Sequence, residues 1–130
     1  MRLWHIDIVS VLPDTQLIAQ WRELNSIFKK QDKHILINYI YNYNKQYLLW
    51  YTQVVLHEMR KRNFAIKSWD NYNNYFNDTE PTTKPLVYNE HDNSYFLICY
   101  YNLKEKYIRG QKDFTKDKWA KIADLFKRRF

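Results

Sequence analysis

Arg22 and Glu23 are the residues of this sequence whose types and position best suit chemistry. They lie within Trp21–Leu24, on a segment with helical spacing that follows a short N-terminal arm. An adjacent arginine and glutamate also have an ordinary explanation, because such residues often form a solvated pair on a helix surface. The pattern alone therefore leaves two interpretations open, a reaction centre or a surface pair.

Other familiar catalytic and ligand-binding motifs are absent. The four histidines form no ligand-spaced pair with one another or with Cys99, so the sequence predicts no metal site. The single glycine, Gly110, excludes glycine-rich loops that bind phosphates or dinucleotides. A Ser-His-Asp or Cys-His site cannot be argued from spacing, since the fold assembles such residues. We therefore expect neither a metal nor another cofactor.

The charge and the aromatic content favour a nucleic-acid partner. The 130 residues include 21 Lys and Arg against 14 Asp and Glu, and the formal charge of +7 should attract polyanions. The chain also has 12 Tyr, 7 Phe and 5 Trp, and aromatic rings beside cations can stack on unpaired bases. An aromatic surface could instead meet another protein, which is a third class of function.

The sequence predicts a cytoplasmic protein. Polar residues interrupt the N-terminal segment Met1–Asp7, so it resembles neither a signal peptide nor a transit peptide. No apolar run approaches the ~20 residues of a membrane span. Cys99 is the only cysteine, which excludes an internal disulfide, fits a reducing compartment and suggests a small buried side chain. We expect a location near the nucleoid, or in the host cytoplasm if the protein is phage-encoded.

Apolar spacing predicts a helical N-terminal half. Pro13 and Asp14 should open the first helix, with Asp14 as its N-cap, and residues 35–44 should form a short helix or turn. A second long helix is expected from Lys45 to Arg62, ended by Asn63 in the left-handed conformation. The predicted buried faces are Leu17, Trp21, Leu24 and Phe28 in the first helix and Leu48, Tyr51, Val55 and Met59 in the second.

The C-terminal half is predicted to hold two further helices. Residues 70–93 are rich in Asn and Asp and should form a long surface connection. Tyr95–Tyr107 should be a buried helix, broken at Gly110. Thr115 is the expected N-cap of a last helix. Its apolar face should carry Trp119, Ile122, Ala123 and Phe126.

Several segments resemble the pyrimidine-dimer DNA glycosylase superfamily, the group of phage endonuclease V. The first helix of that family and its surroundings are similar to Val9-Ser10, Arg22-Glu23-Leu24 and Lys33-His34. Glu58–Phe64 is similar to the end of its second long helix, and Leu103–Tyr107 to a third. The opening Met-Arg-Leu-Trp-His resembles a largely uncharacterised bacterial branch of the superfamily.

The resemblance implies a DNA glycosylase and AP lyase that acts on double-stranded DNA with a lesion or an abasic site. The N-terminal amine, here that of Met1, would attack C1′ of the damaged nucleotide, expel the base and form an imine, after which β-elimination cuts the strand. An α-amine suits this step because its ordinary pKa is about 7.7–8.0, against about 10.4 for lysine. Glu23 would stabilise positive charge on the sugar and move protons, and Arg22 would hold a phosphate.

The resemblance also implies a fold and further contacts. We expect an all-α, single compact domain over residues 1–130, with three to four main helices and an N-terminal arm that reaches the active site. The protein should be a monomer. DNA contacts are expected from Arg2, Lys29, Lys30, Lys33 and His34.

Three positions depart from the family pattern. Arg2 is not small, so Met1 should not be removed after synthesis. If the arm has one extra residue, Met1 matches the position of the family's nucleophile and Arg2 matches the family's N-terminal arginine. If it has none, the terminus projects one residue too far. Ser26 stands where the family has another basic residue, and the Trp119 helix replaces its aromatic C-terminal tail. The alternative to an enzyme is therefore a non-catalytic nucleic-acid-binding module with the same fold.

Overall fold

The computed structural model describes all 130 residues and contains helices and turns but no strand. Its elements are η1 (Ile6–Val11), α1 (Asp14–Lys30), η2 (Asn38–Asn42), α2 (Lys45–Lys61), α3 (Trp69–Tyr75), α4 (Asn93–Ile108) and α5 (Lys116–Arg129), where η marks a 3-10 helix. Four of the helices have 14 or more residues, so the predicted all-α fold with three to four main helices is confirmed. No helix combines the length and the apolar character that crossing a membrane requires.

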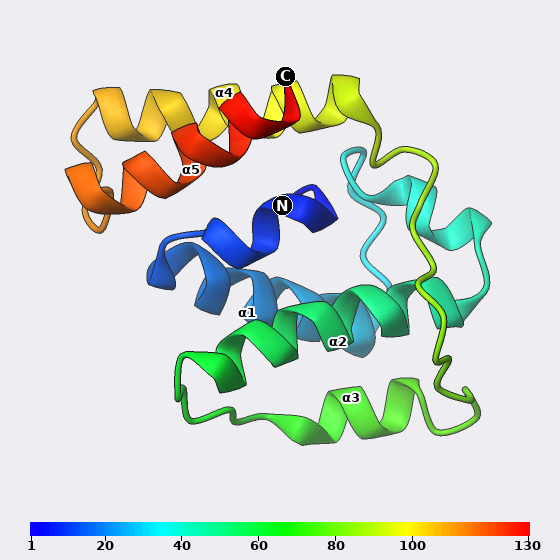
Figure 1. Cartoon of the computed structure of the whole chain (residues 1–130). Coiled ribbons are helices and arrows are strands. Elements are labelled where there is room, and N and C mark those ends of the chain that lie inside the picture. The colour runs from blue at the N-terminus through cyan, green and yellow to red at the C-terminus, as the bar shows by residue number, and fades with distance from the viewer.

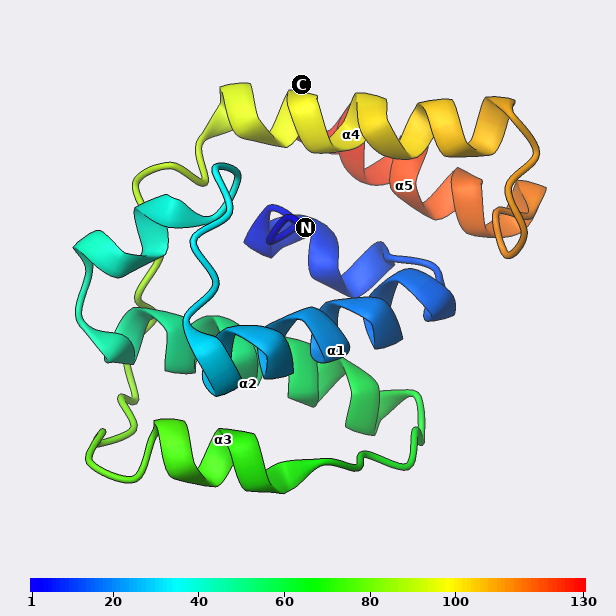
Figure 2. The same cartoon turned by 180° about the vertical axis from the view of Figure 1, so that it is seen from behind.

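The helices are arranged in layers, with the N-terminal arm in the middle. Figures 1 and 2 show α4 and α5 side by side on one side of the arm and η1, and α1 and α2 on the other. The short α3 lies beyond α1 and α2. A cluster of 26 buried hydrophobic residues, drawn from the arm and from most of the helices, forms the core. The arm is therefore enclosed by both helix pairs.

The apolar faces predicted for the first two long helices are buried, as the spacing of their residues indicates. All eight residues named for α1 and α2 are less than a tenth exposed. At the end of α2, Asn63 has a φ of 61°, the left-handed conformation expected for it. Asn44 caps the start of α2, because its side chain accepts a hydrogen bond from the backbone N–H of Gln46 at 3.0 Å.

The capping role predicted for Asp14 is wrong. Pro13 occupies the N-cap position of α1, and Asp14 is the first helical residue. Pro13 has an extended backbone with ψ of 151°, so it can lead into the helix without a backbone donor. The Asp14 carboxylate instead accepts a hydrogen bond from Arg62 at 2.9 Å. The charge of the guanidinium therefore directs this side chain toward α2.

The surface connection predicted for residues 70–93 is wrong in its first part, where α3 forms. α3 has an aromatic face, which the residue after the helix extends, and this face packs on α1. The ring of Trp69 lies 5.5 Å from that of Trp21, and the rings of Tyr72 and Phe76 lie 6.1 and 5.1 Å from that of Phe28. Burial of these rings stabilises a short helix despite its many Asn residues. Beyond Phe76 the chain is an irregular connection to α4, as predicted.

The two C-terminal helices pair through aromatic rings. Tyr100 stacks on Phe126 at 4.2 Å, and Tyr107 stacks on Trp119 at 5.0 Å. Thr115 caps α5 as predicted, and Gly110 ends the turn after α4 with a φ of 72°.

The predicted burial of α4 holds for one side of the helix only, because Ile98 and Ile108 are 51% and 69% exposed.

Candidate active site

The N-terminal arm is held by its backbone between α1, α2 and α4. The amide of Gln20 donates to the carbonyl oxygen of Arg2 at 3.1 Å, and the hydroxyl of Tyr95 donates to that of Leu3. The backbone N–H of Trp4 donates to Gln20 Oε1 at 2.9 Å. The hydroxyl of Tyr51 lies 2.7 Å from the carbonyl oxygen of Trp4. Three helices thus hold the backbone of Arg2, Leu3 and Trp4.

Gln20 is the residue that joins the arm to Glu23. It is 1% exposed, and its amide nitrogen also donates to Oε2 of Glu23 at 3.2 Å. Its amide oxygen accepts from the Tyr51 hydroxyl at 2.8 Å as well as from Trp4. Every polar group of this buried side chain is therefore used.

Sequence reasoning missed Gln20, although the sequence holds a signal for it. Gln20 lies three residues after Leu17 and four before Leu24, so it falls on the buried face of α1. A polar residue on a buried face needs hydrogen-bond partners, so this position indicates a polar network inside the fold. The partners themselves are distant in sequence and could not be inferred.

Glu23 is half-buried, and the N-terminal ammonium acts on its carboxyl group electrostatically but forms no ion pair with it. Burial raises the pKa of its carboxyl group. The N-terminal ammonium, the backbone of Arg2, and the side chains of Arg22 and Lys106 all oppose this shift, but burial prevails. The N-terminal amine of Met1 is thus within electrostatic reach of Glu23, and the roles predicted for the two residues stay a prediction. A carboxyl group with a raised pKa suits proton transfer near neutral pH.

Arg22 faces a different part of the surface from Glu23. It is exposed, has no ion-pair partner in the chain, and lines a cavity of about 530 Å³ beside Trp21, Asn25 and Phe64. Successive residues of a helix point about 100° apart, so the two side chains face different neighbours within the chain. The structure thus places Arg22 next to Glu23 along α1 but on a different face of the helix.

The other predicted DNA contacts differ in their surroundings. Arg2 is partly buried, and its guanidinium lies 5.9 Å from the centre of the Trp4 ring and 5.8 Å from that of Tyr95. The remaining four residues are exposed at the end of α1 and just beyond it: Lys29, Lys30, Lys33 and His34. None of these four has an ion pair within the chain, so the ammonium groups of the three lysines are free to meet a ligand. Nδ1 of His34 accepts from the backbone N–H of Leu36 at 3.2 Å. Ser26 lies half-buried between Arg22 and Lys29.

A second set of buried polar groups anchors the far end of the arm. The backbone N–H of Ile6 donates to Nδ1 of His91 at 3.0 Å, and Nε2 of His91 is 2.7 Å from the hydroxyl of Tyr39. The backbone N–H of His5 donates to the sulfur of Cys99 at 3.4 Å. Burial lowers the pKa of His91 to about 3 and raises that of Cys99. Cys99 is fully buried, as expected, and no cluster of three or more His, Cys, Asp or Glu residues could hold a metal ion.

Comparison with known proteins assigns the chain to a family. The model of the family described as Pyrimidine dimer DNA glycosylase matches residues 1–71, which is more than half of the chain. The chain belongs to this family. The resemblance seen in the sequence is thereby confirmed, and membership of a DNA glycosylase family implies a DNA substrate. No curated protein and no solved structure gives a significant match.

The matched residues of this pyrimidine dimer DNA glycosylase family contain most of the candidate site. Residues 1–71 include the arm, α1 and α2, and therefore Met1, Gln20, Arg22 and Glu23. They do not include α4 and α5, although α4 supplies Tyr95 and Cys99 to the arm. The site is thus completed by helices outside the matched range.

Proposed function

We propose that this protein is a DNA glycosylase and AP lyase that acts on damaged double-stranded DNA through an imine at the amine of Met1. The observation that carries the proposal is that Gln20 links the partly buried Glu23 carboxylate to the arm that begins with the amine of Met1. Gln20 holds both partners, because its amide donates to the backbone of Arg2 and to the Glu23 carboxylate. Damage in the form of a pyrimidine dimer fits the family.

The proposed reaction uses the amine as nucleophile and Glu23 as the group that moves protons. The neutral amine forms a bond to C1′ while the bond from C1′ to the base breaks, and opening of the bond between C1′ and the ring oxygen then yields a protonated imine. Removal of a C2′ proton breaks the bond from C3′ to its oxygen and cuts the strand. Water then hydrolyses the imine and frees the amine. Glu23 would assist ring opening and the removal of the C2′ proton.

The proposed DNA contacts follow from exposed cations along α1. Arg22 would hold a phosphate beside the lesion. Lys29, Lys30, Lys33 and His34 would contact phosphates farther along the duplex, and Arg2 would contact the damaged nucleotide from the arm. A lesion weakens base stacking, so extrusion of a nucleotide costs less there than in intact duplex. The proposal treats residues 1–130 as one monomeric domain in the cytoplasm and uses no metal or cofactor.

Borohydride trapping tests the imine directly. The protein with a free N-terminus is mixed with a duplex that contains one abasic site, the imine is reduced, and the adduct is mapped by mass spectrometry. We expect the adduct on the N-terminal peptide, whose mass also shows that Met1 carries the amine. Acetylation of the α-amine should remove it. Tight binding to abasic and dimer-containing duplexes without any adduct would overturn the proposed lyase.

The second candidate is a binding module that has the same fold but no lyase activity. It is favoured by Ser26, which stands without charge at a position where a cation is expected, and by the guanidinium of Arg2, which lies over two aromatic rings of the protein. This candidate predicts duplex binding with a steep salt dependence but no strand cleavage on any substrate. The trapping experiment separates the two.

A further inference from the structure

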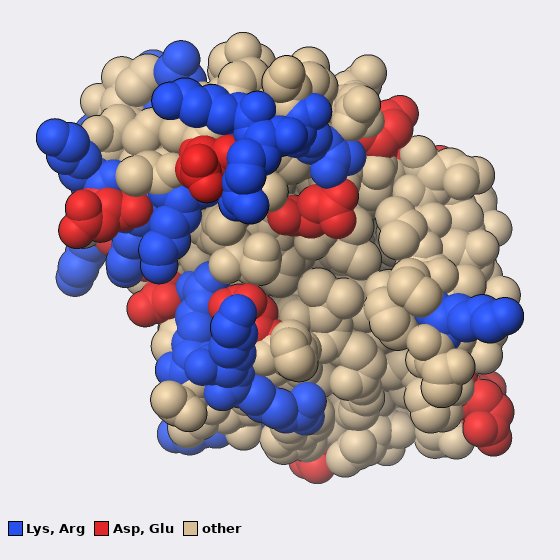
Figure 3. All heavy atoms as spheres, viewed as in Figure 1, with Lys and Arg blue, Asp and Glu red and all other residues tan.

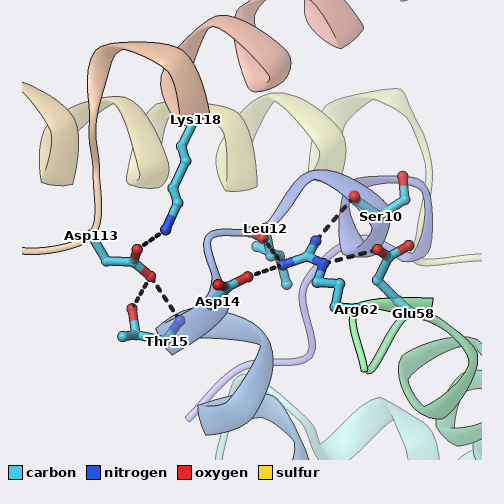
Figure 4. A network of polar contacts seen from close by, with 8 residues as sticks. All are labelled: Ser10, Leu12, Asp14, Thr15, Glu58, Arg62, Asp113 and Lys118. Carbon is cyan, nitrogen blue, oxygen red and sulfur yellow. Dashed lines mark hydrogen bonds and ion pairs between the residues drawn. The ribbon is translucent and has the colours of Figure 1, made fainter. Parts of the chain in front are cut away.

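A polar cavity lies where α2, α5 and the turn from η1 to α1 meet. Its volume is about 440 Å³. The charged residues that line it are Asp14, Glu58, Lys61, Arg62, Lys118 and Lys121. We call this cavity the basic groove, because four of these side chains are cations and two are carboxylates. Figure 4 shows the polar contacts that surround it.

Arg62 fixes the shape of the basic groove and neutralises its carboxylates. Its guanidinium donates to Glu58 and to Asp14, both at 2.9 Å. It also donates to the carbonyl oxygens of Leu12 at 2.7 Å and Ser10 at 3.1 Å (Figure 4). Both acids of the groove are therefore already bound to a cation of the protein.

Lys118 is likewise bound within the chain. Its ammonium group contacts the carboxylate of Asp113, which also accepts from the backbone N–H and the hydroxyl of Thr15 at 2.8 and 2.9 Å (Figure 4). Although burial opposes the shift, these contacts lower the pKa of Asp113. This ion pair ties α5 to the start of α1 and leaves Lys118 little freedom to bind a ligand.

Lys61 and Lys121 are the two cations of the groove without a partner. Both are exposed, and neither takes part in a hydrogen bond or an ion pair of the structure. Lys61 ends α2, where a cation suits the helix dipole. Lys121 lies within α5, so the dipole does not explain it. Two unpaired cations on facing walls of a rigid polar groove are an arrangement that binds phosphate groups.

The two free cations of the basic groove belong to other helices than Glu23 does. Glu23 and Lys106 belong to α1 and α4, which are nearest to the viewer in Figure 2. Lys61 and Lys121 belong to α2 and α5, which are nearest to the viewer in Figure 1. Lys118 and Lys121 lie outside the residues matched by the family, so α5 completes the groove from outside the matched range.

We propose that the basic groove binds the phosphodiester backbone of a second DNA segment while the first segment occupies the candidate active site. Positive charge continues beyond the groove, because Arg128 and Arg129 share the face of α5 that carries Lys121, at the spacing i+7 and i+8. Arg128 is paired with Asp124 and Arg129 with Asp7, so Lys121 is the free cation of this face. Figure 3 shows Lys and Arg side chains gathered over α5 and over the neighbouring end of α2. A row of cations fits a polymer of phosphates better than a single small anion. The choice of DNA rests on the DNA-binding part of the proposed function.

A capture assay with undamaged DNA tests this inference. The full-length protein is bound to one duplex on beads, and a labelled second duplex is added. Wild-type protein should retain the label, and Lys61→Gln with Lys121→Gln should reduce the captured second duplex at least about tenfold, because each phosphate contact contributes to the salt-dependent affinity. Lys84→Gln, which removes one exposed charge from the connection between α3 and α4, is the control and should leave capture unchanged.

Lysine acetylation of the wild-type protein provides a measurement that does not depend on variants. A second equivalent of duplex should protect Lys61 and Lys121 but leave Lys84 reactive. If inorganic pyrophosphate protects both lysines and a second duplex does not, the ligand is a small anion and the inference is overturned. Equal capture by wild type and the double variant would also overturn it. Capture of the second duplex without a borohydride adduct would contradict the proposed lyase activity but support DNA binding by the groove. An adduct without capture would support the lyase activity but contradict DNA binding by the groove.

Discussion

The side-chain amide of Gln20 donates to Oε2 of Glu23 across 3.2 Å, and the same nitrogen donates to the carbonyl oxygen of Arg2. One buried group thereby sets the position of a carboxylate relative to the chain terminus. The distance between these two groups depends on a residue that carries no charge and does not face the solvent. Gln20 is thus a positioning residue in the proposed mechanism.

Replacement of Gln20 should weaken both the fold and the proposed reaction. Gln20→Leu leaves the backbone N–H of Trp4 and the hydroxyl of Tyr51 without their shared acceptor, so the free energy of unfolding should fall by about 2 kcal/mol. Gln20→Glu keeps the acceptor but loses both donated hydrogen bonds and adds a charge beside Glu23. It should reduce the rate of borohydride trapping while binding to undamaged duplex stays within about twofold of wild type. Equal trapping rates in wild type and Gln20→Glu would remove the positioning role.

Glu23→Gln should separate DNA binding from strand cleavage. The amide keeps the size of the side chain and its contact with Gln20 but cannot exchange a proton, so cleavage of an abasic duplex should fall at least about a hundredfold. Affinity for the duplex, measured by fluorescence anisotropy, should change little. Glu105→Gln, on the exposed surface of α4, is the control and should cleave normally. Normal cleavage by Glu23→Gln would contradict the assignment.

The same variant should be more stable than wild type at neutral pH. Because burial raises the pKa of Glu23 in the folded protein, the folded state holds its proton more tightly than the unfolded state, and stability falls as pH rises through the raised pKa. Glu23→Gln has no such loss. Thermal unfolding should show a higher Tm for the variant at pH 7, and the difference should shrink as pH falls to about 4, where the unfolded carboxyl group is also protonated.

His91 should make the fold sensitive to acid. Its folded-state pKa of about 3 lies well below the ordinary value of 6.5, so the unfolded state binds the proton first and stability falls as pH decreases through this window. Between pH 6.5 and pH 5 the loss should be about 2 kcal/mol. His91→Gln, which can still accept from Ile6, should show a smaller slope in urea unfolding over this range. His34→Gln, at an exposed position, should retain the wild-type slope.

Arg62 should contribute strongly to stability because its partner is buried. Arg62→Met removes the cation from Glu58, which is only 8% exposed, so the free energy of unfolding should decrease by about 3 kcal/mol in urea titrations. Arg109→Met breaks a pair with Glu105 whose side chains are both more than half exposed, and the change should stay below about 0.5 kcal/mol. Similar losses in both variants would show that burial does not set the strength of these pairs.

The long helices were predictable because their apolar residues recur at helical spacing. Leu17, Trp21 and Leu24 in α1, and Ile122 in α5, lie on the faces that the spacing indicates. The aromatic residues of α3 stand among Asn and Asp, so its helical pattern was hidden until its rings met those of α1. Asp14 looked like a cap because its long-range partner, Arg62, could not be foreseen.

The candidate site was predictable only in part, for a related reason. Arg22, Glu23 and the N-terminus could be named from local sequence and from family resemblance. The groups that hold the arm could not, because their partners are far away along the chain: Gln20 lies 16 residues from Trp4, His91 lies 85 from Ile6, and Tyr95 lies 92 from Leu3. Spacing within a segment carries no information on such pairs.

The contacts of Tyr95 and Cys99 with the arm bear on how the protein is made. Because Leu3 and His5 bond to side chains of α4, the start of the chain reaches its final position only after about a hundred residues have been synthesised. During translation, α1 and α2 can pair while the terminal amine is still undocked. A chain interrupted before α4 would then contain Glu23, Gln20 and every cation of α1 but would lack the contacts of Tyr95 and Cys99 with the arm. The ribosome thus completes the proposed reaction centre near the end of synthesis, although its nucleophile is the first group that the ribosome produces.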